Sequence, residues 1–173
     1  MKINFGKALE LVLKSEGGFQ KDERDPGNAN GGMTNLGCTK STWESWLGHP
    51  VSENDMRLLK ITDVAPLYKQ KYWDRVSGDD LPSGLDYAVF DAAINSGAGR
   101  ASKWLQETLN VKADGVIGPI TIKAAKACDV MRLIAQFNDT RLRFLEELPT
   151  WGTFGRGWSN RVSSVQSDST KMV

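Results

Sequence analysis

The chain has 173 residues, of which 40% are hydrophobic and 25% charged, and its formal net charge is +1. This length and composition predict one ordinary globular domain with a hydrophobic core, and they exclude disordered and fibrous proteins. The balanced charge, without a block of Lys and Arg, argues against nucleic acid as a partner. We also expect no membrane insertion, because no stretch approaches the roughly 18 apolar residues of a spanning helix.

Cysteine and histidine are scarce in this chain. The two cysteines, Cys38 and Cys128, form no disulfide framework, so we predict two free thiols. The one histidine, His49, stands in an LGHP turn and excludes a cluster of histidine metal ligands. We therefore expect neither a metal ion nor another cofactor.

The first predicted element is a helix over residues 4–15, because its apolar residues recur at helical spacing. This apolar stripe consists of Phe5, Ala8, Leu9, Val12 and Leu13. Glu16 continues the stripe, whereas Lys7, Glu10 and Lys14 lie on the opposite face. Burial penalises the ionised form of a carboxyl group, and an acid that keeps its proton near neutral pH can act as a general acid. The alternative is an exposed glutamate paired with a nearby Lys or Arg, and the helix alone leaves both open.

Two glycines, Gly17 and Gly18, end this helix and lead into a polar loop. Asp25 lies in that loop, in a setting that would keep it solvated and ionised. Two carboxyl groups in contrasting environments are what glycoside hydrolysis needs, since one protonates the leaving oxygen while the other acts at the sugar carbon or on a water. Thr34 and Thr39 follow with hydroxyls that can orient water or substrate.

The segment from Glu16 to Thr39 resembles the opening signature of glycoside hydrolase family 108, whose members are peptidoglycan N-acetylmuramidases, many of them phage endolysins. The matching residues are Glu16, Gly17, Gly18, Phe19, Asp25, Pro26, Gly27, Gly32, Thr34, Asn35, Gly37 and Thr39. The order Glu, Asp, Thr is also similar to phage lysozymes of glycoside hydrolase family 24. The resemblance implies that Glu16 is the catalytic acid, Asp25 the second carboxylate and Thr34 the threonine of the cleft.

Three helices are predicted between residues 39 and 73. The first is capped by Thr39, closed by Gly48 and turns Trp43, Trp46 and Leu47 to its apolar side. The second starts at Ser52 and directs Met56, Leu58 and Leu59 inward; the third has Thr62 as its N-cap and runs to Trp73. Aromatic side chains here suit sugar rings, but we favour a core position for Trp73 and expect Tyr72 to be more open.

Residues 84–97 are the best candidate for a central buried helix, followed by another helix over residues 100–109. The run F-D-x-A-I-N-S-G in the first of these again resembles family 108. Asp91 and Asn95 share one helix face, where they would either contact substrate or form a hydrogen-bonded pair at the helix end.

The C-terminal part contains a turn at Asp114–Gly115 and a helix starting at Pro119. The phrase D-G-x-x-G-P-x-T is similar to peptidoglycan-binding modules. The same residues are equally well explained as a turn followed by the cap of a helix. A long helix over residues 129–148 then stops at Pro149, residues 157–162 resemble the family's closing G-W-x-x-R-V, and the polar residues 166–173 are predicted to fray.

These patterns predict a mainly α, single lysozyme-like domain over residues 1–173, with a catalytic part at 1–95, a C-terminal helical part at 96–165 and at most a short hairpin near residues 30–38. The resemblance implies an endolysin that hydrolyses the β-1,4 bond between N-acetylmuramic acid and N-acetylglucosamine. The predicted substrate-binding residues are Gly17, Phe19, Thr39, Tyr72, Asp91 and Asn95. Two alternatives stay open: a lytic transglycosylase acting on the same bond, and a non-catalytic peptidoglycan-binding or phage structural module.

The N-terminal residues are interrupted by charges and lack the apolar core of a signal peptide. We therefore expect a monomer that stays in the cytoplasm of the producing cell and meets peptidoglycan glycan strands once a holin has permeabilised the membrane.

Overall fold

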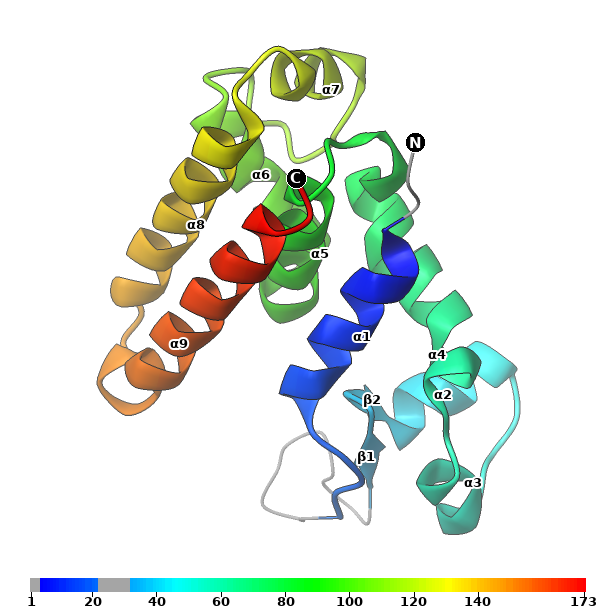
Figure 1. The fold of residues 1–173 in the computed structure, drawn as a ribbon. Helices are drawn as coiled ribbons and strands as arrows, with labels where there is room; N and C mark the ends of the chain where they lie inside the picture. The colour runs from blue at the N-terminus through cyan, green and yellow to red at the C-terminus, as the bar shows by residue number, and fades with distance from the viewer. Residues whose placement is uncertain (1–3, 22–31) are drawn as a thin grey trace. The chain divides into compact units, whose positions relative to one another are not determined.

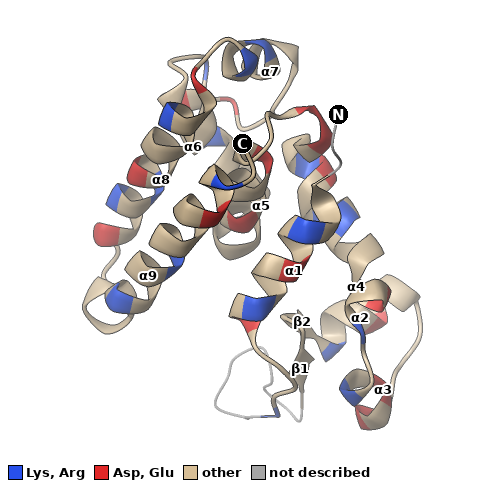
Figure 2. Ribbon diagram, in the orientation of Figure 1, with Lys and Arg blue, Asp and Glu red and all other residues tan. Residues whose placement is uncertain are grey.

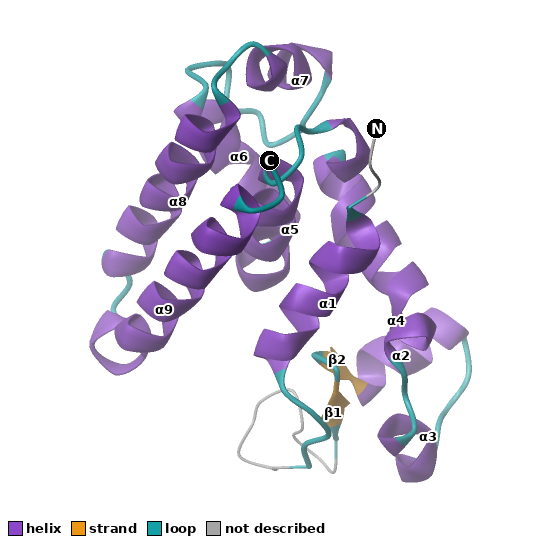
Figure 3. Cartoon of the chain, viewed as in Figure 1, coloured by secondary structure: helices purple, strands orange, loops and turns teal. Residues whose placement is uncertain are grey.

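The computed structural model describes residues 4–21 and 32–173, and within these ranges the chain is mainly helical (Figures 1 and 3). The strands described there form one two-stranded antiparallel sheet, which confirms the predicted fold class. The chain divides into two compact units: an N-terminal unit, Leu9–Lys69, and a C-terminal unit, Met1–Ala8 with Gln70–Val173. In the part of the chain that is described, no helix has the length and apolar character needed to cross a bilayer.

Helix α1 (Phe5–Glu16) has the predicted bounds within a residue. Four residues of its stripe are buried: Ala8, Leu9, Val12 and Leu13. The helix ends at Glu16 because Gly17 takes a left-handed conformation with φ 79°. Gly17 thus ends the helix as the sequence predicted.

The N-terminal unit contains a hairpin of strands β1 (Thr34–Asn35) and β2 (Cys38–Thr39). Thr34 faces Thr39 and Asn35 faces Cys38 in the register. Both residues of the connecting turn have positive φ, 49° at Leu36 and 68° at Gly37, as a two-residue hairpin turn of the primed type requires. This is the short hairpin that the sequence predicted.

Helices α2 (Lys40–Leu47) and α3 (Glu53–Arg57) begin at the predicted caps. The Thr39 hydroxyl accepts a hydrogen bond from the Thr42 amide, and Ser52 forms a reciprocal capping box with Asp55. The prediction that Leu47 and Leu58 point inward is wrong, because Leu47 is 38% exposed and Leu58 is 65% exposed. Both lie at the last turn or just beyond the end of a short helix, where the apolar stripe leaves the core.

Helix α4 (Ile61–Tyr68) starts earlier than predicted. The expected N-cap, Thr62, lies inside the first turn, because the Asp63 carboxylate accepts a hydrogen bond from the Lys60 amide at 2.8 Å and fixes the helix start there. The chain continues through a π-helix, η2 (Lys69–Trp73), and two 3-10 turns, η3 (Asp74–Val76) and η4 (Gly78–Asp80).

In the C-terminal unit, Trp73 is fully buried, as favoured from the sequence. Its indole Nε1 donates to Asp79 at 2.8 Å, and its ring makes edge contacts with Phe5 and Phe90 at centroid distances of 5.4 and 5.3 Å. A side chain at Gly78 would collide with this ring, so the glycine allows the close approach.

Helix α5 (Leu85–Ser96) is the central buried helix, as predicted. Every residue from Leu85 to Ala93 is buried, and the helix packs against α6 (Ala98–Thr108), α8 (Val130–Glu146) and α9 (Trp151–Thr170). Helix α7 (Pro119–Lys126) has proline at its first position, also as predicted.

Helix α9 continues to Thr170 and corrects the prediction that residues 166–173 fray. Glycine and serine disfavour helix in isolation, but burial of Val162, Val165 and Ser169 stabilises the helix through packing. The Ser83 hydroxyl donates to the Met172 carbonyl at 2.6 Å, and Gly84 leaves room for the Ser169 carbonyl. Tertiary packing therefore overrides local propensity at this end of the chain.

One buried carboxylate connects three of these helices. Asp91 of α5 lies 2.7 Å from Arg141 of α8 and 2.9 Å from Arg161 of α9. The side chains of Asp91 and Arg141 are each 1% exposed. The contact with Arg141 is an ion pair without hydrogen-bond alignment, whereas Arg161 donates through both Nε and Nη2.

We predict that Asp91→Asn lowers the free energy of unfolding by about 3–5 kcal/mol, because it leaves the buried Arg141 without its counter-charge. Urea denaturation measures this. Asp168→Asn is the control, since Asp168 pairs with Lys171 on the surface at 2.9 Å and should cost less than about 1 kcal/mol. Equal effects of the two substitutions would contradict the structural role of Asp91.

Candidate active site

Glu16 is the last residue of α1, and it is half-buried rather than buried. The helix phase correctly places it next to the apolar stripe, but the backbone turns away at Gly17 and the following glycine adds no side chain to cover it. Glu16 therefore lies at the border between the core and solvent.

The hairpin turn lies against the side chain of Glu16. A Cβ atom built on Gly37 would stand 3.1 Å from both Cβ and Cγ of Glu16 and 2.8 Å from the hydroxyl of Tyr68. That hydroxyl donates a hydrogen bond to the Leu36 carbonyl at 2.9 Å. Position 37 requires glycine for two reasons: its φ is positive, and Glu16 and Tyr68 occupy the space that a side chain would need.

Two further contacts hold the hairpin in place. Asn35 is only 6% exposed, and its Nδ2 donates to the carbonyl of Met56 at 2.8 Å, which ties β1 to the end of α3. The backbone of Thr34 exchanges hydrogen bonds of 2.7 and 2.9 Å with Gln20, on the segment that follows Glu16. The backbone of Thr34 is therefore held against the segment that follows α1.

Phe19 is half-buried, and the guanidinium of Arg57 lies 4.0 Å from its ring centroid. Arg57 in turn forms an ion pair with Glu53 at 2.6 Å, and Lys21 contacts the same carboxylate at 2.6 Å. Hydrogen bonds from Lys21 and then Arg57 lower the pKa of Glu53. The Lys21–Glu53 ion pair joins the segment after Glu16 to α3, and Arg57 covers one face of the Phe19 ring.

The predicted site residues fall into both units. Glu16, Gly17, Phe19, Thr34 and Thr39 belong to the N-terminal unit, whereas Tyr72, Asp91 and Asn95 belong to the C-terminal unit. Asp25 lies outside the described residues. The hydroxyl of Thr39 caps α2, and Tyr72 is half-buried in η2, more open than its neighbour Trp73.

Asp91 does not form the expected pair with Asn95. Its carboxylate is 1% exposed and is held by two arginines, so we assign it to the core rather than to substrate binding. Asn95 is exposed near the end of α5, and its Oδ1 accepts from Arg141 at 3.5 Å and from Ser96 at 3.2 Å.

The residues that sequence reasoning missed as parts of the site are Asn35, Gly37 and Tyr68, which position Glu16 and Thr34 without supplying an acid or base. Asn35 and Gly37 appeared only as matches to a motif. The signal for their role was the order asparagine-x-glycine, which places Gly37 at the second position of a two-residue hairpin turn. Nothing in the sequence indicates that Tyr68 reaches the Leu36 carbonyl.

The D-G-x-x-G-P phrase folds as a turn held by a buried glutamine. Gln106 of α6 donates to the Asp114 carboxylate at 2.8 Å and accepts from the Gly115 amide at 2.8 Å. The hydrogen bond from Gln106, followed by that from the Val116 amide, lowers the pKa of Asp114. The side chains of this phrase therefore serve turn and cap geometry in this structure.

Comparison with known proteins gives two adjacent matches to protein families. The family described as Glycosyl hydrolase 108 matches residues 9–97, and the family described as Predicted Peptidoglycan domain matches residues 100–163. The solved structure of SagA from Brucella abortus is similar to this chain, with a TM-score of 0.84 and 41% sequence identity over 99% of this chain and 97% of SagA. No curated protein matches the chain.

We predict that Gly37→Ala lowers the free energy of unfolding by about 1–3 kcal/mol, the usual cost of a strained left-handed residue together with local crowding. Thermal and urea unfolding measure the loss. Gly18→Ala is the matched control, because nothing lies within 4 Å of a Cβ atom at that position. If both substitutions leave stability unchanged, the turn is not packed against Glu16 as described.

Proposed function

Since this chain belongs to the glycosyl hydrolase 108 family, we propose that it hydrolyses the β-1,4 bond between N-acetylmuramic acid and N-acetylglucosamine. Family membership makes the protein a glycoside hydrolase that acts on peptidoglycan, and the second match makes peptidoglycan its partner. The observation that carries the finer proposal is the position of Glu16. Glu16 is a half-buried acid at the end of a buried helix stripe, and the stem of its side chain packs against the hairpin turn.

In this proposal Glu16 donates its proton to the glycosidic oxygen as the bond to the sugar carbon breaks. A general acid must be held in one place while it transfers the proton, and the contact with Gly37 restricts the stem of its side chain. The proposal requires the carboxyl group, beyond that stem, to reach the glycosidic oxygen.

Asp25 is the second carboxylate of the proposed mechanism, carried over from the family motif. A carboxylate in this role stabilises positive charge at the sugar carbon, attacks that carbon or activates a water molecule. Thr34 is the proposed polar group that orients water or a substrate hydroxyl, and its backbone is fixed by two hydrogen bonds to Gln20.

We further propose that the enzyme serves as a phage endolysin. The support is the resemblance of the Glu, Asp, Thr order to phage lysozymes. In that role the protein acts on the cell wall from inside the host after a holin has opened the membrane.

The products of digestion test the proposed bond. Mass spectrometry of purified peptidoglycan after digestion should show muropeptides with reducing N-acetylmuramic acid ends. Anhydro ends would instead assign the enzyme to the lytic transglycosylases, and reducing N-acetylglucosamine ends would move the cut to the other glycosidic bond.

Substitution of Glu16 by Gln tests the catalytic acid. The amide keeps the shape of the side chain but has no proton to donate, so turnover should fall by about 10²–10⁴. The melting temperature should hold or rise, because catalytic groups often lower stability. Release of reducing ends and thermal unfolding measure the two effects.

Glu10→Gln is the matched control, since Glu10 lies on the exposed face of the same helix and should leave turnover unchanged. Asp25→Asn should also lower turnover. If Glu16→Gln keeps near-normal turnover in a folded protein, Glu16 is not the acid, and Glu23 is the next carboxyl group to test.

A further inference from the structure

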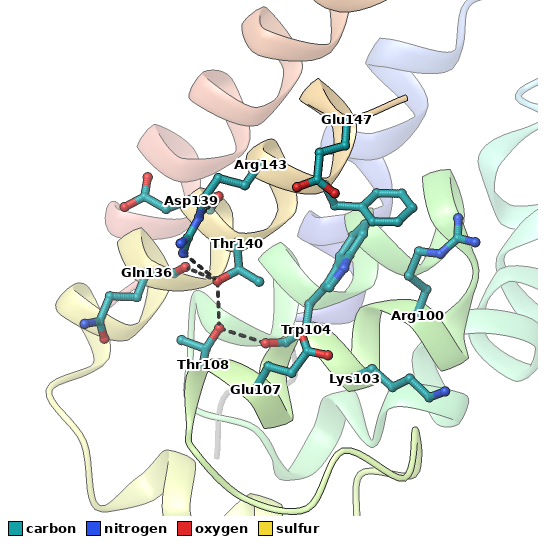
Figure 4. Close-up of a pocket in the computed structure, with 11 residues that line it drawn as sticks. Arg100, Lys103, Trp104, Glu107, Thr108, Gln136, Asp139, Thr140, Arg143 and Glu147 are labelled. Carbon is teal, nitrogen blue, oxygen red and sulfur yellow. Dashed lines mark hydrogen bonds between the residues drawn. The ribbon is translucent and has the colours of Figure 1, made fainter. Parts of the chain in front are cut away.

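Helices α6 and α8 border a groove of about 880 Å³ within the C-terminal unit (Figure 4). It lies in the segment that matches the peptidoglycan family, residues 100–163, and takes no part in the chemistry proposed for Glu16. Six charged residues line it: Arg100, Lys103 and Glu107 from α6, and Asp139, Arg143 and Glu147 from α8 and its C-terminal end.

Ion pairing within the fold leaves these six charges available to a ligand. Among the residues that the structure describes, none of the six has an ion-pair partner, in contrast to the buried cluster around Asp91. Arg143 makes only long hydrogen bonds, of 3.4 Å to the Asp139 carbonyl and 3.5 Å to the Thr140 hydroxyl. Cations and anions are equal in number in the groove, and Figure 2 shows both signs interspersed along α8. The groove therefore offers charged donors and acceptors together.

The floor of the groove offers little open aromatic surface. Trp104 is 4% exposed and contacts Phe144 in a tilted arrangement with ring centroids 5.2 Å apart, and the guanidinium of Arg100 covers the Phe144 ring at 4.7 Å. The hydroxyls of Thr108 and Thr140 meet at 3.3 Å and join the two helices. A neutral sugar ring binds best on an open aromatic face, so this floor does not favour the glycan.

We propose that this groove binds the stem peptide of peptidoglycan. A stem peptide carries several carboxylates and, where it contains a diamino acid that is not cross-linked, an ammonium group. The three cations fit the carboxylates through charge-assisted hydrogen bonds, and the three acidic side chains fit the ammonium group. A purely anionic polymer would meet those same acidic side chains, so the mixed charge favours the zwitterionic peptide.

This proposal rests on peptidoglycan as the substrate and adds a second point of attachment. A chain that holds the peptide in one part and cleaves the glycan in another raises the effective concentration of its substrate. The groove should therefore lower the KM for intact peptidoglycan without changing the turnover of glycan chains that carry no peptide.

Nuclear magnetic resonance titration of the full chain with the synthetic tetrapeptide L-alanyl-γ-D-glutamyl-meso-diaminopimelyl-D-alanine tests the proposal. Shifts should concentrate at the Trp104 indole N–H and at backbone amides of residues 100–108 and 136–147. Lys103→Gln and Arg143→Gln should each weaken binding by about fivefold or more, as expected for a lost charge-assisted hydrogen bond. Lys123→Gln on the exposed surface of α7 makes the same charge change outside the groove and should bind normally.

Two further measurements separate this proposal from the proposed catalytic function. Glu16→Gln should bind the tetrapeptide like the unmodified chain, and Lys103→Gln should hydrolyse peptide-free glycan at the normal rate but show a raised KM on intact peptidoglycan. Absence of tetrapeptide binding, or equal weakening by Lys123→Gln, overturns the groove proposal whatever Glu16 does. Groove shifts caused by a chito-oligosaccharide and not by the tetrapeptide overturn it in favour of a glycan site.

Discussion

The C-terminal unit depends on the charge of one buried residue, Asp91. Its carboxylate lies on the central helix α5 and pairs with both Arg141 from α8 and Arg161 from α9. Buried ion pairs add little net stability compared with apolar packing, but removing one partner leaves an unpaired charge in the core. The pairing therefore specifies which helix faces meet. Helix α9, whose sequence has little intrinsic helix propensity, is held in its register by this contact and by its apolar residues.

The N-terminal unit depends on a close approach instead of a charge. Gly37 allows the hairpin turn to lie against the side chain of Glu16. The Tyr68 hydroxyl of α4 holds the turn at Leu36, and Asn35 of β1 ties the hairpin to the Met56 carbonyl of α3. The same turn holds the backbone of Leu36 in a strained left-handed conformation, with φ 49°. Strain of this kind persists where surrounding contacts enforce it, and here those contacts surround the proposed catalytic acid.

Local patterns in the sequence predicted most of the elements and missed what depends on distant contacts. Helix α1, its glycine stop and the cap at Thr39 follow from periodicity and cap chemistry, which act within a few residues. The half-buried state of Glu16 was not predicted, because helix phase gives the face of a residue but not what covers it. The length of α9 and the partners of Asp91 were not predicted either, since both are determined by side chains far away in the chain.

The family motifs acquire a physical meaning once their residues are seen as partners. Asp91 belongs to the F-D-x-A-I-N-S-G run and Arg161 to the closing G-W-x-x-R-V, yet the two side chains form an ion pair at 2.9 Å. Asp114 of the D-G-x-x-G-P-x-T phrase is held by Gln106 of α6 at 2.8 Å. In the opening motif, Asn35 and Gly37 supply geometry to Glu16. Asp91, a candidate for substrate contact in the sequence, is thus one half of a contact that builds the frame, and Glu16, Asp25 and Thr34 stay the residues proposed to carry the chemistry.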